Sequence, residues 1–337
     1  MIGQGFDILA ESTRGGHVES VHAGAVAVVD TAGRLLYSAG DPDFPAFTRS
    51  TIKPFQALPL LRAGGHEKFR FGSREIALLC ASHSGEDMHT SVVQRMLHEA
   101  GCDEHHLRCG CHVPLRYGTG EAPPAGMSFN QLHNNCSGKH AGFLAYCVQH
   151  GLPLDSYLDP SHPLQQAVRR SVASAARLPE TALITGTDGC SAPNFALPLS
   201  RLAHAYARLS QGEGDTEAGD LYGLLFAAMT GHPELVSGSG RGDLAFMRTA
   251  PGDWVAKGGA EAVQVLGIRS AGIGIAVKIA DGGARALYPA TIAVLRDIGL
   301  LPDPSATPLR EWEQPALKNL RGLQTGVLRA TLRLRRH

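Results

Sequence analysis

The order of apolar patterns along the chain restricts its fold more than any single motif does. An alternating stretch at 18–38, broken by a turn that starts at Asp30, predicts a β-hairpin near the start. Helical spacing follows, and strand patterns return at 254–280 before a final helix at 284–298. We therefore predict an α+β fold, an α/β sandwich in which segments from both ends of the chain build one antiparallel sheet around an inserted helical region.

We predict a single domain for the 337 residues. Residues 1–48 and about 250–300 are expected to supply the sheet, and residues from about 50 to 245 to be mainly helical. A chain of this length can hold one large domain or two closely joined ones.

The charge balance and the cysteine content narrow the classes of partner and compartment. The chain has 31 Lys plus Arg and 31 Asp plus Glu, so no net field attracts nucleic acid or an anionic membrane. We find no run of about 18 apolar residues and therefore expect no membrane span. No signal peptide is recognisable, and seven cysteines are an odd number, which predicts reduced thiols in the cytoplasm. The basic tail from Arg329 to His337 is predicted to be a solvated terminus.

A serine stands three residues before a lysine in the stretch from Arg49 to Pro54. At this spacing the side chains of Ser50 and Lys53 share one face of a helix, and Pro54 is typical of a first helical turn. A serine hydroxyl needs a base at hydrogen-bond distance in order to attack a carbonyl group, and a neutral lysine can be that base. Taken alone, the same pattern also describes a capping serine with a solvated lysine.

Two later stretches supply further candidate groups. Ser82 lies in a turn of small and polar residues, where it is either a helix cap or a second catalytic hydroxyl. Lys257 precedes Gly258 and Gly259, which would let a substrate approach a strand edge closely. The alternative for Lys257 is a surface lysine before a turn.

Cysteine positions raise the possibility of a metal site. Cys136, Lys139 and Cys190 form one candidate set, and two thiolates can hold zinc, preferably with two more ligands. The spacing matches no zinc finger, and a buried free thiol is the common alternative. A second group competes for the same role: Cys109, Cys111 and His112.

Together these stretches resemble the L-asparaginase II family, the rhizobial-type or class 3 asparaginases. The similarity covers most of the chain, and its most specific part is Asn-Asn-Cys-Ser-Gly-Lys-His at 134–140. The other matching stretches are His22–Gly24, Arg49–Ala57, Ala81–Glu86, Cys109–Gly110, Asp188–Cys190 and Lys257–Glu261.

The resemblance implies that the protein hydrolyses L-asparagine, a small-molecule amide, to L-aspartate and ammonia. It also implies a fold like that of serine β-lactamases and glutaminases, and a homodimer. Two serine–lysine pairs are implied, Ser50 with Lys53 and Ser82 with Lys257. Substrate contacts are implied for five residues: Arg49, His83, Asp188, Gly258 and Gly259.

The family's zinc site maps by the same resemblance onto Cys136, Lys139 and Cys190. There zinc would orient the substrate or tune the site rather than drive the chemistry. Two positions depart from the family pattern, which favours glycine where this chain has Ser191 and Ala262. Three other functions stay open at this point: a serine acyl hydrolase of the β-lactamase or peptidase kind, a zinc-dependent amidohydrolase, and a non-catalytic protein stabilised by zinc.

Overall fold

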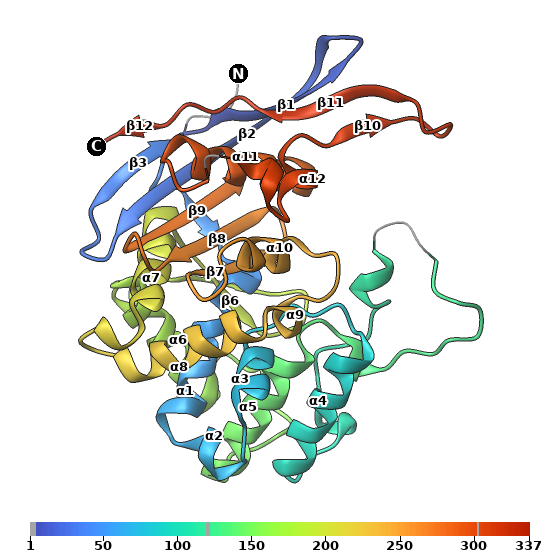
Figure 1. Ribbon diagram of the computed structural model, residues 1–337. Coiled ribbons are helices and arrows are strands. Elements are labelled where there is room, and N and C mark those ends of the chain that lie inside the picture. Colours follow the sequence, from blue (N-terminus) through green and yellow to red (C-terminus); the bar gives the residue numbers. More distant parts are fainter. Residues whose placement is uncertain (1–4, 119–121, 302) are drawn as a thin grey trace. The chain divides into compact units, whose positions relative to one another are not determined.

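The computed structural model describes residues 5–118, 122–301 and 303–337, and it divides the chain into two compact units (Figure 1). The sheet unit comprises Met1–Thr51, Leu197–Ser210 and Ala245–His337. The helical unit comprises Ile52–Ala196 and Gln211–Leu244. Each unit thus gathers segments that are distant in the sequence. The prediction that the 337 residues form a single domain stays a prediction.

The sheet unit is built on nine antiparallel strands. Strand β2 (His17–Asp30) pairs with β9 (Ile273–Ile279), so the first and last thirds of the chain are neighbours in one sheet (Figure 1). This confirms the predicted α+β fold with a sheet made from both ends of the chain. The strand order is β10–β11–β1–β2–β9–β8–β7, with β3 also paired to β2 and β12 to β3. The other elements of the unit are β1 (Asp7–Arg14), β3 (Leu35–Ala39), β4 (Pro45–Phe47), β7 (Trp254–Gly259), β8 (Val263–Ile268), β10 (Ala316–Lys318), β11 (Gln324–Ala330), β12 (Arg335–Arg336), α7 (Leu199–Gln211), α10 (Gly242–Thr249), α11 (Ala284–Asp297), α12 (Arg310–Glu313) and a 3-10 turn at Pro304–Ala306.

Strands β8 and β9 are buried at every residue, as expected for strands with both faces covered. Helix α11 packs against β8 and β9, and α7 lies on another side of these strands (Figure 1). Two paired glycines, Gly267 and Gly274, allow the close approach of α7. A Cβ atom at Gly274 would lie 1.8 Å from the Ala203 carbonyl oxygen, and one at Gly267 would lie 2.4 Å from that of Tyr206.

The C-terminal tail is not the solvated terminus that its charge predicts. Strand β11 pairs with β1, and β12 pairs with β3. Leu328 and Leu332 are buried, whereas Arg329 donates a hydrogen bond of 2.6 Å to Glu11 on the neighbouring strand. The tail therefore has the alternation of a half-buried strand, which its many arginines conceal in the sequence.

The helical unit packs its helices closely around α5 (Ser137–His150). Gly138 and Gly142 lie one turn apart on α5, where Cβ atoms would come within 2.4 Å of Leu78 and 2.3 Å of Leu79 on α3 (Ser73–Leu79). The residues after α3 are thereby brought beside the start of α5. The remaining elements of this unit are α1 (Lys53–Arg62), α2 (Gly65–Lys68), α4 (Asp87–Glu99), α6 (Pro163–Ala176), α8 (Gly219–Gly231), α9 (Pro233–Val236), β5 (Ile184–Thr187), β6 (Pro193–Pro198) and 3-10 turns at Glu104–His106, Leu115–Tyr117, Gln131–His133, Glu180–Ala182 and Gly212–Gly214.

Most predicted helices and strands are present, with one notable shift. Apolar spacing in the sequence predicts a helix at 195–210, but the helix begins at Leu199, because the residues before it form β6. Strand β6 pairs with β5, with Ala196 opposite Ile184. Within the described ranges, no helix has both the length and the apolar character needed to cross a membrane.

Candidate functional site

The Ser50–Lys53 spacing falls where a 3-10 turn (Arg49–Ile52) runs into α1. Ser50 belongs to the sheet unit and is 8% exposed, whereas Lys53 belongs to the helical unit and begins α1. Arg49 has a φ angle of 49°, which is unusual for a residue with a side chain. Backbone strain of this kind concentrates at functional sites. The pairing of Ser50 with Lys53 itself stays a prediction.

Lys53 is completely buried within the helical unit, and its amine lies among oxygen atoms. Nζ donates hydrogen bonds to Ser82 Oγ at 3.0 Å, to the Ala81 carbonyl, and to the Asn135 carbonyl at 3.4 Å. These partners come from the segments after α3 and before α5, which the packing of the two helices brings together. Lys53 therefore contacts Ser82, whereas the family resemblance pairs Ser82 with Lys257.

Ser82 does not cap a helix. Helix α4 begins at Asp87 and has Glu86 as its N-cap residue, so the capping alternative for Ser82 is wrong. The Ser82 side chain is buried, its hydroxyl accepts from Lys53, and its backbone N–H donates to the Val236 carbonyl at 2.9 Å. Both the hydroxyl and the backbone of this serine are therefore held by neighbours.

His83, predicted to contact substrate, is fully buried, and both of its ring nitrogens are bonded to protein groups. Nδ1 accepts from the Gly85 N–H at 3.1 Å, so we assign the ring proton to Nε2, which lies 2.9 Å from Ser137 Oγ. The ring stacks on His89 with centroids 4.9 Å apart. Burial, with nearby positive charge from His89 and Lys53, lowers the pKa of His83 well below its usual value.

Lys257 and its two glycines lie on β7, which ends the strand order, as predicted for a strand edge. Lys257 is completely buried and its Nζ donates to the Gly258 carbonyl at 2.7 Å, so the alternative of a surface lysine is wrong. A Cβ atom at Gly259 would lie 3.0 Å from the Thr48 carbonyl and 3.2 Å from the Arg49 side chain. Within the sheet unit, Arg49 and the predicted substrate strand therefore lie next to each other.

Cys136, Lys139 and Cys190 lie together in the helical unit, and all three are buried. Lys139 Nζ is 3.0 Å from Cys190 Sγ. A hydrogen bond from Cys136 and the positive charge of Lys139 lower the pKa of Cys190, while the pKa of Cys136 is raised by the same hydrogen bond and by burial. Burial works against a charged Lys139, but negative charge on Cys190 outweighs it and raises the pKa of Lys139. These pKa shifts favour a charged Lys139 beside an ionised Cys190, with Cys136 as a thiol.

This donor set fits zinc. Cys190 Sγ contacts both other donors, since it lies 3.0 Å from Lys139 Nζ and accepts a hydrogen bond from Cys136, and soft sulfur ligands favour zinc among the biological metals. Asp188 Oδ2 lies 3.9 Å from Cys190 Sγ, as expected for a carboxylate beside the site. Binding would require Cys136 and Lys139 to lose their protons. Across the described ranges, no group of three or more His, Cys, Asp or Glu side chains is placed to hold a metal, so lysine is essential to the candidate.

The competing thiols do not form an alternative site. Cys111 is exposed, whereas Cys109 is buried and its pKa is raised by burial to about 12. His112 uses Nδ1 to bond the Val113 carbonyl at 2.7 Å, and its Nε2 accepts from the Asn135 N–H at 3.1 Å.

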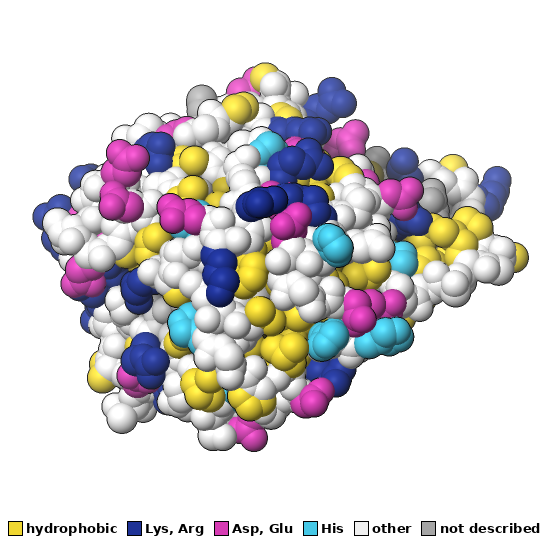
Figure 2. Space-filling view, turned by 90° about the horizontal axis from the view of Figure 1, so that it is seen from below, with side chains coloured by type: hydrophobic (Ala, Val, Ile, Leu, Met, Phe, Trp, Pro, Cys, Tyr) yellow, Lys and Arg dark blue, Asp and Glu magenta, His cyan; other side chains and the backbone are white. Residues whose placement is uncertain are grey.

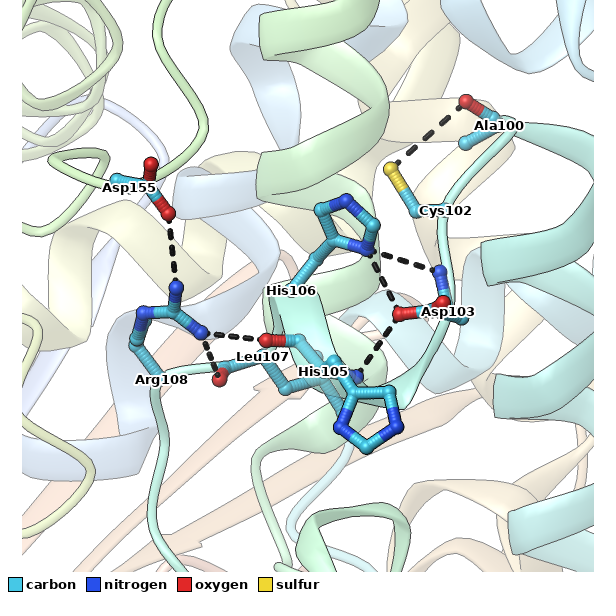
Figure 3. A network of polar contacts seen from close by, with 8 residues as sticks. All are labelled: Ala100, Cys102, Asp103, His105, His106, Leu107, Arg108 and Asp155. Carbon is cyan, nitrogen blue, oxygen red and sulfur yellow. Dashed lines mark hydrogen bonds and ion pairs between the residues drawn. The ribbon is translucent and has the colours of Figure 1, made fainter.

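His140 is a residue of this cluster that sequence reasoning missed, although it ends the most specific motif. Its Nδ1 lies 2.7 Å from the Tyr157 hydroxyl, and the imidazole is one of the groups that lower the pKa of the Cys190 thiol. Tyr157 in turn accepts from the Arg108 N–H at 2.9 Å. Figure 3 shows how the Arg108 side chain is held by Asp155 and by the carbonyl oxygens of His105 and Leu107. Such outer partners orient ligands and fix their protons.

The surface agrees with the zero net charge. Figure 2 shows one face of the molecule, on which basic and acidic side chains are interspersed.

Comparisons with known proteins identify the family but no close relative. Comparison with curated protein sequences gives no match. Three solved structures are distantly similar: a protein named Mglu in 4.3 M NaCl (16% identity over 82% of this chain and 62% of that chain, TM-score 0.37), a simvastatin synthase mutant from Aspergillus terreus (12%, 76% and 86%, 0.36), and a β-lactamase from Mycobacterium bovis (14%, 81% and 94%, 0.35). The chain spans less than two thirds of the length of the first of these.

The family model described as L-asparaginase II matches residues 10–330 of the 337. The match runs from β1 to the end of β11 and includes every residue placed above in either part of the candidate site. The chain therefore belongs to the L-asparaginase II family.

Proposed function

We propose that the protein is an L-asparaginase that hydrolyses L-asparagine to L-aspartate and ammonia through a serine–lysine acyl-transfer mechanism. The observation that carries the proposal is the buried Lys53 amine at 3.0 Å from Ser82 Oγ, in a chain of this family. A buried amine among hydroxyl and carbonyl oxygens is suited to accept and pass on a proton.

In the proposed mechanism Ser50 attacks the side-chain amide carbon of asparagine and gives its proton to neutral Lys53. The C–N bond then breaks, and the departing nitrogen takes up a proton that Lys53 passes through Ser82, so ammonia leaves. Water next attacks the acyl carbon and loses a proton to Lys53. The bond between that carbon and Ser50 Oγ then breaks, and Lys53 passes the proton to Ser50, which regains its hydroxyl group. Lys257 is proposed to assist the transfer at Ser82. The positive charge that builds up on Lys53 would be stabilised by the Ala81 and Asn135 carbonyls.

The same proposal assigns substrate contacts to Arg49, Asp188 and the Gly258–Gly259 strand edge. Cys136, Lys139 and Cys190 would hold zinc, which when bound supplies a fixed positive charge beside Asp188. His83 would support Ser82 from behind rather than touch the substrate, since both of its nitrogens are occupied.

The compartment and the assembly complete the proposal. All seven cysteines are free, which fits a reducing cytoplasm. We propose a homodimer on the family resemblance, and light scattering of the purified protein would measure its mass directly.

Ammonia release from asparagine and from glutamine tests the proposal, using wild type, Ser50→Ala and Ser82→Ala. Asparagine should be the better substrate, and each variant should lose turnover by about 10²- to 10⁴-fold. Ser91→Ala, an exposed serine on α4, is the matched control and should keep full activity. If Ser50→Ala retained a tenth of the rate, Ser50 would not be the nucleophile. Hydrolysis of nitrocefin without ammonia release would instead indicate a β-lactamase.

A further inference from the structure

Residues 234–239 comprise most of the short helix α9 and the three residues after it, and their centre is hydrogen-bonded to the Ser82 segment. The Ser82 N–H donates to the Val236 carbonyl at 2.9 Å, and Ser84 Oγ donates to the Ser237 carbonyl at 2.9 Å. Ser82 has no regular secondary structure of its own to fix its backbone. Its peptide group is therefore placed by a segment that is more than 150 residues away in the chain.

Both ends of residues 234–239 are held by the first turn of α4. At one end, Glu86 accepts from the Ser239 N–H at 2.9 Å with Oε1 and from Ser239 Oγ at 3.0 Å with Oε2. At the other end, His89 Nε2 lies 3.0 Å from the Glu234 carbonyl. His89 Nδ1 accepts from the Glu86 N–H at 3.2 Å, so the ring proton is on Nε2 and is donated to that carbonyl.

Gly238 shows how closely the two segments approach. Its φ angle is 110°, a conformation that side chains rarely allow. A Cβ atom there would lie 2.6 Å from both Ser84 Oγ and Glu86 Oε1. Substitution of this glycine would push residues 234–239 away from the carboxylate that holds them.

We propose that Glu86 is a positioning residue for the reaction: its carboxylate holds residues 234–239 in place, and these residues hold the backbone of Ser82 so that its hydroxyl stays at Lys53. Glu86 carries out this role through charge-assisted hydrogen bonds, which are stronger than neutral ones. The effect on catalysis rests on the function proposed above for Ser82. The effect on the Ser82 backbone is independent of that proposed function.

The experiment compares Glu86→Gln with Asp87→Asn, which makes the same chemical change one residue later at an exposed position of α4. Amide hydrogen exchange at residues 82–86 should become roughly tenfold faster in Glu86→Gln and stay unchanged in Asp87→Asn. For asparagine hydrolysis, kcat should fall roughly tenfold to a hundredfold in Glu86→Gln, with KM altered less than about threefold, because the loss is one of alignment.

Ser239→Ala provides a second variant that removes one of the two contacts to the carboxylate. It should show the same changes at smaller size, and combined with Glu86→Gln it should add nothing further. Equal exchange at residues 82–86 in Glu86→Gln and Asp87→Asn would overturn the positioning role, whatever the activity. Faster exchange in a protein whose wild type releases no ammonia would support the positioning of Ser82 and overturn the proposed function instead. A loss expressed in KM rather than kcat would also overturn the role of Glu86.

Discussion

Two buried lysines of the helical unit, Lys53 and Lys139, have opposite surroundings. Lys53 is 0% exposed and faces a serine hydroxyl and two carbonyl oxygens. Lys139 is 2% exposed and faces the sulfur of Cys190 at 3.0 Å, with the Phe143 ring at 5.4 Å. The first amine has partners through which a proton can move. The second has a partner, Cys190, whose negative charge raises the pKa of the amine and favours its charged form.

The difference shows that burial alone does not decide what a lysine does. Burial disfavours the charged form of any lysine, and the partner determines whether that tendency survives. At Lys139 the charge of Cys190 outweighs burial and raises the pKa of the amine. We therefore propose proton transfer for Lys53 and zinc binding for Lys139, and the predictions below test that division.

The largest expected effects come from replacing each lysine with methionine, which keeps the length of the side chain and removes its amine. Lys53→Met should lower ammonia release by about 10²- to 10⁴-fold and leave the zinc content unchanged. Lys139→Met should abolish bound zinc and lower activity about tenfold or less, because zinc is proposed to tune the site. Lys68→Met, at an exposed lysine, is the control. Elemental analysis and ammonia assays measure both effects, and equal inactivation by the two changes would break the comparison.

The next effect in size is a loss of folding stability as the pH decreases. Burial lowers the pKa of both His83 and His89, whose rings stack on each other. An unfolded imidazole has a pKa of about 6.5, so below that pH the unfolded chain binds protons that the folded protein does not. The free energy of unfolding should therefore be highest above about pH 6.5 and fall by up to about 1.4 kcal/mol per pH unit for each imidazole as the pH decreases.

Urea unfolding between pH 7.5 and 5.5 measures this slope. His89→Gln should reduce it, whereas His17→Gln, which changes an exposed histidine, should leave it as in wild type. An undiminished slope in His89→Gln would show that the acid sensitivity arises elsewhere.

The smallest expected effect is a change in stability on replacing Ser191, the residue after Cys190. Ser191 follows Cys190 with a φ angle of 68°, and Ala262, the other departure from the family's glycines, has a φ angle of 53°. A residue with a side chain in the left-handed conformation costs about 1–2 kcal/mol of stability, which glycine would remove. Glycine in turn lowers stability by about 0.4–1 kcal/mol, because it raises the entropy of the unfolded chain. Ser191→Gly should thus raise the free energy of unfolding by about 0.5–1 kcal/mol.

The control for this change is Ser191→Ala, which keeps a Cβ atom and should give no gain. Denaturant unfolding of both variants decides the point. A glycine variant no more stable than the alanine variant would mean that the turn at Asp188–Ala192 carries no strain, although Ser191 N–H bonds the Asp188 carbonyl at 2.9 Å.

Sequence reasoning succeeded where the signal is local or repeats with a short period. The hairpin at β2 and β3, the start of α1 at the Ser50–Lys53 spacing, and the buried strands β8 and β9 all follow from patterns within a few residues. It failed at β11 and β12, where arginines on the exposed face outweigh a two-residue alternation. It also missed Glu86 and His140, whose importance depends on partners far along the chain.

The sequence by itself determined the order of helices and strands, the family, and the identity of the reactive groups, because side chains three or four residues apart are placed by backbone geometry alone. The tertiary structure decided which of those groups face each other. Lys53 meets Ser82 across 29 residues and Lys139 meets Cys190 across 51. Such contacts depend on how segments that are distant in the sequence pack, as α3 and α5 do at Gly138 and Gly142, and no local pattern encodes that approach.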